Sequence, residues 1–110
     1  MDKNDVLAGF SALSQQTRLD VFHLLVKAGA EGILSGEIGD RLSVRQNTMS
    51  ANLTVLLNAG LVVKERQGRT IRYFADFETV RGLLAFLMED CCGGNPELCQ
   101  SVIDEIACVA

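Results

Sequence analysis

The feature that most constrains the fold is a change of hydrophobic period at Gly60. Before it, four apolar residues fall at the three- and four-residue spacing of a single helix face: Met49, Leu53, Leu56 and Leu57. After it, residues 61–66 and 70–75 are β-rich and flank the turn sequence Gln67-Gly68-Arg69, which is typical of a β-hairpin. Glycine at position 60 suits the left-handed end of a helix. The sequence therefore predicts a helix that leads directly into a hairpin.

More helices are predicted upstream of this pair. Ser43-Val44-Arg45-Gln46 matches a capping box, so the helix before the hairpin is expected to start at Ser43. A short helix over residues 34–42 precedes it, with Ser35 as its expected cap and an internal Gly39 that indicates close crossing by another backbone. Apolar spacing predicts two earlier helices, over residues 6–13 and from the cap Ser14 to Gly29.

Two helices are expected after the hairpin. The one from Glu78 onward carries more apolar residues than one core face needs, which suggests a dimer interface. Gly93-Gly94 is expected to end it, and Asn95-Pro96-Glu97 has the cap, proline and carboxylate of a new helix start. The predicted fold class is mostly α with a small β-hairpin: a homodimeric winged helix-turn-helix, built as a single domain over residues 1–110.

The charge pattern has a basic centre despite a net charge of −4. Residues 41–73 carry six basic and one acidic side chain, whereas both flanking segments are acidic. A polyanion such as DNA is bound through cationic contacts, so the central segment is the candidate. The longest apolar runs are far shorter than the roughly 18 residues that span a membrane. Because the N-terminus lacks the pattern of a secretory signal, a cytoplasmic protein with free thiols is expected.

Polar residues at the start of the predicted 43–60 helix have the chemistry of DNA recognition. Amides pair with adenine and arginine pairs with guanine in a major groove about 12 Å wide. Arginines on the hairpin would contact phosphates or the minor groove. The predicted DNA-binding residues are Arg45, Gln46, Asn47, Thr48, Ser50 and Asn52 on the helix, with Arg66, Arg69 and Arg72 on the hairpin.

These segments resemble the ArsR/SmtB family of metal- and metalloid-responsive repressors. The resemblance rests on Glu37-Ile38, on residues 46–53, on Leu56-Leu57-Asn58-Ala59-Gly60-Leu61-Val62 and on the Arg66-Gln67-Gly68-Arg69 turn. It implies homodimers that pair through the first and last helices and bind double-stranded palindromic operators. Many relatives carry histidine where this chain has Asn52, whose amide can still contact a phosphate or a base.

The segment Cys91-Cys92-Gly93-Gly94-Asn95-Pro96-Glu97-Leu98-Cys99 is the predicted ion site. Thiolates select soft ions, and three thiolates without a fourth donor suit arsenite or antimonite better than four-coordinate zinc. Cys99 lies near a helix N-terminus that favours its thiolate, so it is expected to bind first. Within the family, Cys-Cys followed later by Cys resembles the arsenite site of one branch. The expected function is a repressor that leaves its operator when As(III) or Sb(III) binds Cys91, Cys92 and Cys99.

Three alternatives stay open at this point. The same fold could carry a thiol redox or persulfide switch, or a cadmium or lead sensor. A thiol-dependent arsenate reductase needs an arginine a few residues after its nucleophilic cysteine, and none follows Cys91, so we expect no enzyme. A metallochaperone that never binds DNA would differ in a salt-dependent DNA-binding assay. Cys108 is expected to be a small buried apolar residue.

Overall fold

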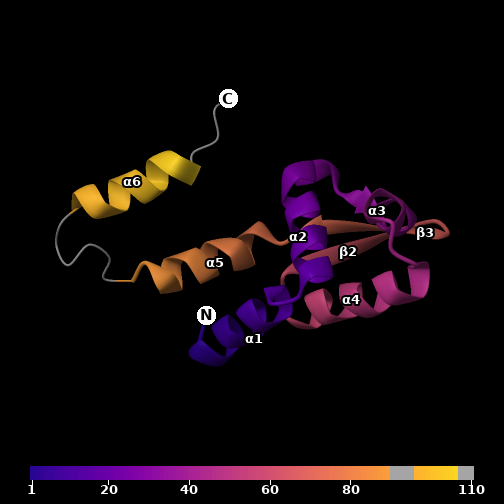
Figure 1. Ribbon diagram of the computed structural model, residues 1–110, viewed down its shortest axis with the longest axis horizontal. Helices are drawn as coiled ribbons and strands as arrows, with labels where there is room; N and C mark the ends of the chain where they lie inside the picture. The colour runs from indigo at the N-terminus through magenta and orange to yellow at the C-terminus, as the bar shows by residue number, and fades with distance from the viewer. Residues whose placement is uncertain (90–95, 107–110) are drawn as a thin grey trace.

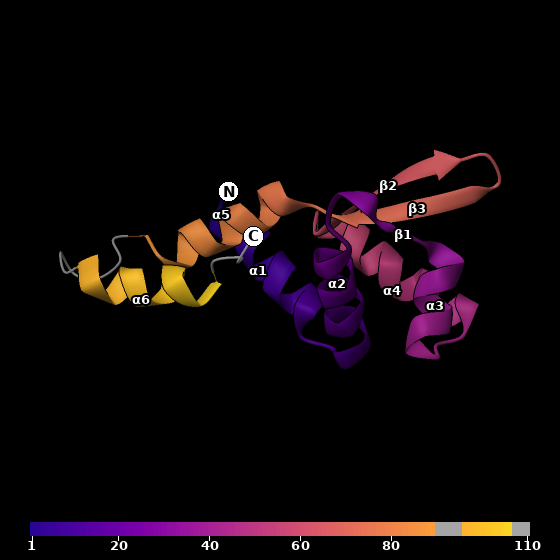
Figure 2. The same cartoon turned by 90° about the horizontal axis from the view of Figure 1, so that it is seen from above.

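The computed structural model describes residues 1–89 and 96–106. Its elements, in chain order, are α1 (Lys3–Leu13), α2 (Gln16–Ala28), η1 (Gly29–Glu31), β1 (Ile33–Leu34), α3 (Ser35–Leu42), α4 (Gln46–Asn58), β2 (Val62–Gln67), β3 (Thr70–Ala75), α5 (Phe77–Leu87) and α6 (Pro96–Ile106). Figures 1 and 2 show α2, α3, α4 and the β2–β3 hairpin together at one end, with α5 and α6 reaching away from them. The predicted winged helix-turn-helix order is confirmed.

The sheet has one more strand than the sequence predicts. β2 and β3 pair antiparallel from Val62↔Ala75 to Gln67↔Thr70, which confirms the hairpin. β1 adds on the other side of β3 through Ile33↔Tyr73, giving the order β1-β3-β2. A strand of two residues is too short to show a hydrophobic period, so no pattern predicts it. The added strand fixes the base of the hairpin against η1 and α3.

The predicted caps of α2, α3 and α4 are wrong. Gln15, and not Ser14, caps α2 by accepting a hydrogen bond from the backbone N–H of Arg18, 2.8 Å away. Ser35 is the first residue of α3, and Leu34 is its N-cap. Ser43 adopts a left-handed conformation (φ 55°) that ends α3, so α4 begins at Gln46 and has no side-chain cap.

Two predictions about glycine are confirmed. A Cβ on Gly39 would lie 3.0 Å from the carbonyl oxygen of Val44, so another backbone does cross closely there. Gly60 has a φ of 77°, the left-handed conformation expected after α4. Gly39 thus lies against the turn between α3 and α4, and Gly60 turns the chain from α4 toward β2.

The core lies between α2, α3, α4 and the sheet. Its largest fully buried side chains include Leu25 of α2, Ile38 of α3, and Met49, Leu53 and Leu56 of α4. The apolar face predicted for α4 is therefore its buried face, with Leu57 partly buried at its edge. In the described part of the chain, no helix is both long and apolar enough to cross a membrane.

Candidate DNA interface and cysteine site

The N-terminal end of α4 presents a row of exposed polar side chains. Arg45, Gln46, Asn47, Thr48 and Ser50 are all exposed, and we call them the polar face of α4. Met49, between them in sequence, is fully buried, so α4 is held by one face while the other is free. The geometry is that of a helix which can enter a groove; that these five residues contact DNA stays a prediction.

Asn52 lies one turn after Thr48 but, unlike the polar face, is buried. Asn52 is 9% exposed, and among the described residues it is the one polar or charged residue that is buried. Its Oδ1 accepts a hydrogen bond from an Nη1 of Arg18 (3.3 Å), and its Nδ2 donates to the carbonyl oxygen of Thr48 (3.2 Å). The predicted direct contact of Asn52 with DNA does not fit this position, because its amide is already used inside the protein.

The three hairpin arginines occupy two different positions. Arg66 and Arg69 are exposed near the turn at Gly68. Arg72 is partly buried: its Nε donates to Oε1 of Gln67 (3.0 Å) and an Nη1 donates to the carbonyl oxygen of Glu31 (3.2 Å). Arg72 thus ties the hairpin to η1, and its predicted role on DNA fits the structure less well than that of the other two.

Three of the predicted DNA-binding arginines carry charges that no ion pair neutralises in the described part of the chain. Arg41 of α3 forms an ion pair with Glu37 one turn earlier, 3.1 Å between N and O. Arg45, Arg66 and Arg69 form no ion pair with another described residue. Their charges are available to an anionic partner such as the phosphate backbone.

The cysteine site falls partly outside the described residues. Among the residues outside the described part of the chain are Cys91, Cys92, the Gly93-Gly94 pair, the Asn95 cap and Cys108. Their predicted roles stay predictions. Cys99 is described and lies in the first turn of α6, as expected. The structure has it disulfide-bonded. The free thiols expected in a reducing compartment stay a prediction. Among residues 1–89 and 96–106, no three metal-ligating side chains cluster.

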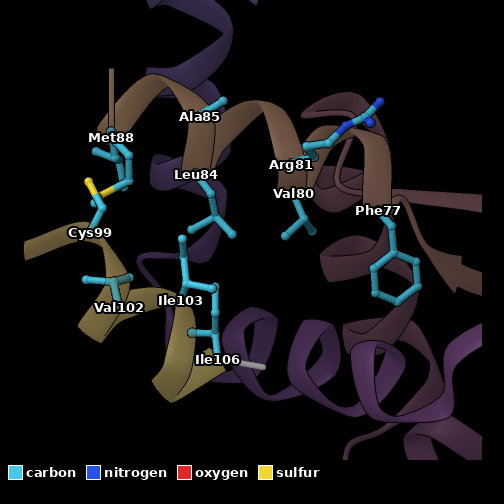
Figure 3. Close-up of a pocket in the computed structure, with 11 residues that line it drawn as sticks. Phe77, Val80, Arg81, Leu84, Ala85, Met88, Cys99, Val102, Ile103 and Ile106 are labelled. Carbon is cyan, nitrogen blue, oxygen red and sulfur yellow. The ribbon is translucent and has the colours of Figure 1, made fainter. Parts of the chain in front are cut away.

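Cys99 also lines an apolar cavity of about 510 Å³ between α5 and α6. Figure 3 shows Met88 at the end of α5 next to Cys99, with Leu84, Ile103 and Ile106 pointing into the space between the two helices. The ends of α5 and α6 that flank residues 91 and 92 therefore lie close together.

A large apolar surface lies on the helices outside the core. Exposed apolar side chains occur on α1, α5 and α6: Leu7, Phe10, Phe77, Leu84, Leu87, Leu98, Val102, Ile103 and Ile106. Six of the α5 and α6 residues line the same cavity and so lie near one another, and clustered apolar surface of this kind marks an interaction site. The excess apolar face predicted for the helix after the hairpin is thus found, and α1 exposes apolar side chains as well.

An exposed polar helix end beside a basic hairpin, on this order of helices, defines the class: a winged helix-turn-helix DNA-binding regulator. The helix-turn-helix domain family matches residues 13–65. The chain is 33% identical over 90 residues to the uncharacterized HTH-type transcriptional regulator YbzH of Bacillus subtilis, covering 71% of this chain and 90% of that one. It is 34% identical over 83 residues to the arsenical resistance operon repressor of the same organism, covering 76% and 75%.

Solved structures agree with this class. An ArsR-like transcriptional regulator from Rhodococcus sp. RHA1 has a TM-score of 0.68 at 27% identity, covering 94% of this chain and 93% of that one. A homodimeric winged helix-turn-helix DNA-binding domain from Mycobacterium bovis has a TM-score of 0.65 at 25% identity, covering 93% and 81%. The chain belongs to the ArsR family of helix-turn-helix transcriptional regulators. It is a DNA-binding regulator and not an enzyme, as predicted.

Proposed function

We propose that this regulator is an arsenite-responsive repressor, which binds a palindromic operator as a homodimer and leaves it when As(III) or Sb(III) binds Cys91, Cys92 and Cys99. Residues 1–110 form a single domain that carries both operator binding and ion binding. The protein acts in the cytoplasm, where the operator DNA is. The observation that carries the proposal is the position of Cys99 in the first turn of α6, beside Met88 at the end of α5. Cys91 follows Met88 by three residues, a chain length that spans at most about 11 Å.

The donor set supports this class of ion. Three thiolates match the three bonds of trivalent arsenic, whose lone pair occupies the fourth position, whereas structural zinc takes four ligands. The positive end of α6 favours the thiolate of Cys99. The 34% identical arsenical resistance repressor of Bacillus subtilis supports the same inducer.

The apolar surface supports the homodimer. α1, α5 and α6 expose Leu7, Phe10, Leu84, Leu87 and Ile103, and the relative from Mycobacterium bovis is homodimeric. A dimer that pairs through these helices sets the spacing of its two α4 helices, which must reach half-sites about 34 Å apart. Ion binding at the junction of α5 and α6 would favour a different arrangement of this interface. A differential affinity of about 1 to 3 kcal/mol is the usual size of such coupling.

The test is a fluorescence-anisotropy titration of labelled operator with the fully reduced protein, with and without arsenite. Arsenite is expected to weaken operator binding, and the weakening is expected to vanish in Cys91→Ser, Cys92→Ser and Cys99→Ser. Cys108→Ser is the matched control and should respond like the wild type. Release that persists in all three cysteine variants would refute the site.

The disulfide at Cys99 favours a second candidate, a thiol redox switch. In this case peroxide takes two electrons from a pair of thiolates, the disulfide forms, and peroxide is reduced to water. Release of operator by peroxide but not by arsenite, reversed by a dithiol reductant, would identify this function. The two candidates use the same cysteine, so the fully reduced starting state is required in both experiments.

A further inference from the structure

Arg18, in the first turn of α2, connects three helices through one guanidinium group. Its Nε donates a hydrogen bond to the carbonyl oxygen of Ala12 in α1, at 2.6 Å. An Nη1 donates to Oδ1 of Asn52 in α4, at 3.3 Å. The first contact holds the last turn of α1, and the second holds the middle of α4.

The chemistry of this contact requires an arginine. The planar fork of the guanidinium directs Nε–H and Nη–H toward two separate acceptors, whereas a lysine ammonium is a single point charge on a flexible stem. Both acceptors are neutral oxygens, and Arg18 forms no ion pair with another described residue. Arg18 is therefore placed by two helices and not by a carboxylate.

Asn52 connects Arg18 to the polar face of α4 through a second hydrogen bond. Its side chain is buried, and its Nδ2 donates to the carbonyl oxygen of Thr48, one turn earlier and within the polar face. A buried amide that loses its hydrogen-bond partner keeps the free-energy cost of desolvation with nothing to offset it. The orientation of the Asn52 side chain therefore depends on Arg18. Arg18 thus acts on α4 immediately behind the residues predicted to contact DNA.

The other end of the contact lies on the part of the molecule that carries the exposed apolar surface. Ala12 is at the end of α1, and α1 packs on α5 where Leu83 meets Gly9. We propose that Arg18 is a positioning residue for DNA binding, which holds α4 to α1 through Asn52 and so fixes the polar face of α4 relative to the helices α1 and α5.

The experiment measures operator affinity and affinity for unrelated duplex DNA over a range of salt, using the reduced full-length protein. The variants are Arg18→Met, Asn52→Leu and the double variant. Lys27→Met is the matched control, because it removes one positive charge from an exposed position on the same helix. Each single variant is expected to weaken operator binding about tenfold, the effect of one hydrogen bond to a charged group. The double variant is expected to lose no more than either single variant, while Lys27→Met stays near wild type.

Salt dependence separates positioning from direct contact with phosphate. A residue that contacts a phosphate contributes about 0.9 to the slope of log affinity against log salt. We expect an unchanged slope and unchanged binding to unrelated DNA in Arg18→Met. A slope smaller by about one unit, additive losses in the double variant, or operator binding equal to wild type would each overturn the proposal.

Arg18→Lys keeps the positive charge and covers the case in which Arg18→Met fails to fold. Because lysine does not reach both acceptors, the operator affinity of Arg18→Lys is expected to fall as well. Full operator affinity in Arg18→Lys would show that charge alone matters and would contradict a positioning role.

Discussion

Leu83 of α5 packs against the backbone of Gly9 in α1, so closely that a Cβ on Gly9 would lie 3.2 Å from Cδ2 of Leu83. Leu83 is buried, whereas its neighbours on α5, Leu84 and Leu87, are exposed. This contact therefore attaches α5 to the rest of the fold and leaves most of its apolar surface to a partner.

The Gly9–Leu83 contact predicts that the effect of Gly9→Ala on the free energy of unfolding differs between the wild type and Leu83→Ala. Alanine gains about 1 kcal/mol over glycine in a helix interior. In the wild type, Leu83 opposes this gain, because its methyl groups must move to admit the new Cβ. In Leu83→Ala, which itself is expected to cost about 2 to 5 kcal/mol, the opposition is gone and Gly9→Ala should stabilise the protein. Urea unfolding at one fixed protein concentration measures both values, and equal effects of Gly9→Ala in the two backgrounds would contradict the contact.

Gly32→Ala is expected to be one of the most damaging glycine substitutions. Gly32 has a φ of 62°, and a Cβ there would lie 2.5 Å from the carbonyl oxygen of Tyr73 and from the ring of Phe74. Gly68, with a φ of 65°, has no atom within 4 Å of an added Cβ. Gly68→Ala should therefore lower the free energy of unfolding only by the cost of placing alanine in a left-handed conformation, about 1 to 2 kcal/mol. Thermal unfolding of the two variants should rank Gly32→Ala clearly lower; similar melting temperatures would contradict the close approach of η1 to the sheet.

The hairpin arginines are expected to fall into two groups on DNA. Arg66→Ala and Arg69→Ala should each weaken binding on any sequence and reduce the salt slope by about 0.9, because both side chains are exposed and available to phosphates. Arg72→Ala should leave the slope unchanged and lower the melting temperature, because Arg72 holds the carbonyl oxygens of Glu31 and Gly32. Salt titrations with circular-dichroism melts separate the two effects. A reduced slope in Arg72→Ala would place it on the DNA instead.

Much of the fold is predictable from the sequence because it depends on local periodicity. Met49, Leu53 and Leu56 are buried as their spacing predicts, and the hairpin follows from its β-rich runs and Gly68. The caps do not follow from the sequence in this way: Ser43 has the pattern of a helix start but ends α3 in a left-handed conformation. The strand β1 depends on pairing with β3, about 40 residues away, which no local pattern reveals.

The DNA interface was predictable in part for the same reason. Helical spacing places Asn47 and Thr48 away from the apolar face and Arg45 at its flank, and all three are exposed. Asn52 lies at the flank of the apolar face, where spacing alone does not decide between solvent and burial. Its buried amide bonds to Arg18, 34 residues earlier. The sequence does not mark Arg18, because a lone arginine near a helix start resembles any surface cation.

The pH dependence of stability is expected to carry a signature of Tyr73. Burial raises the pKa of the Tyr73 phenol above its ordinary value of 10.0. The unfolded chain therefore ionises this group first, and the stabilisation is complete below pH about 10 and lost as the pH rises through the folded pKa. Chemical unfolding at a series of pH values from roughly 9 to 11, a range that brackets the ordinary tyrosine pKa, measures this effect. Over that range the free energy of unfolding of the wild type should fall more steeply than that of Tyr73→Phe. Parallel profiles would show that Tyr73 is not buried.

Arsenic X-ray absorption on the reduced protein, loaded with one arsenite per chain, tests the central claim most directly because it counts the sulfur atoms bound to arsenic. Three sulfur neighbours are predicted for the wild type, with one fewer in each of Cys91→Ser, Cys92→Ser and Cys99→Ser and no change in Cys108→Ser. Arsenic coordinated by oxygen alone, or an unchanged sulfur count in all three cysteine variants, would contradict the proposed sensor.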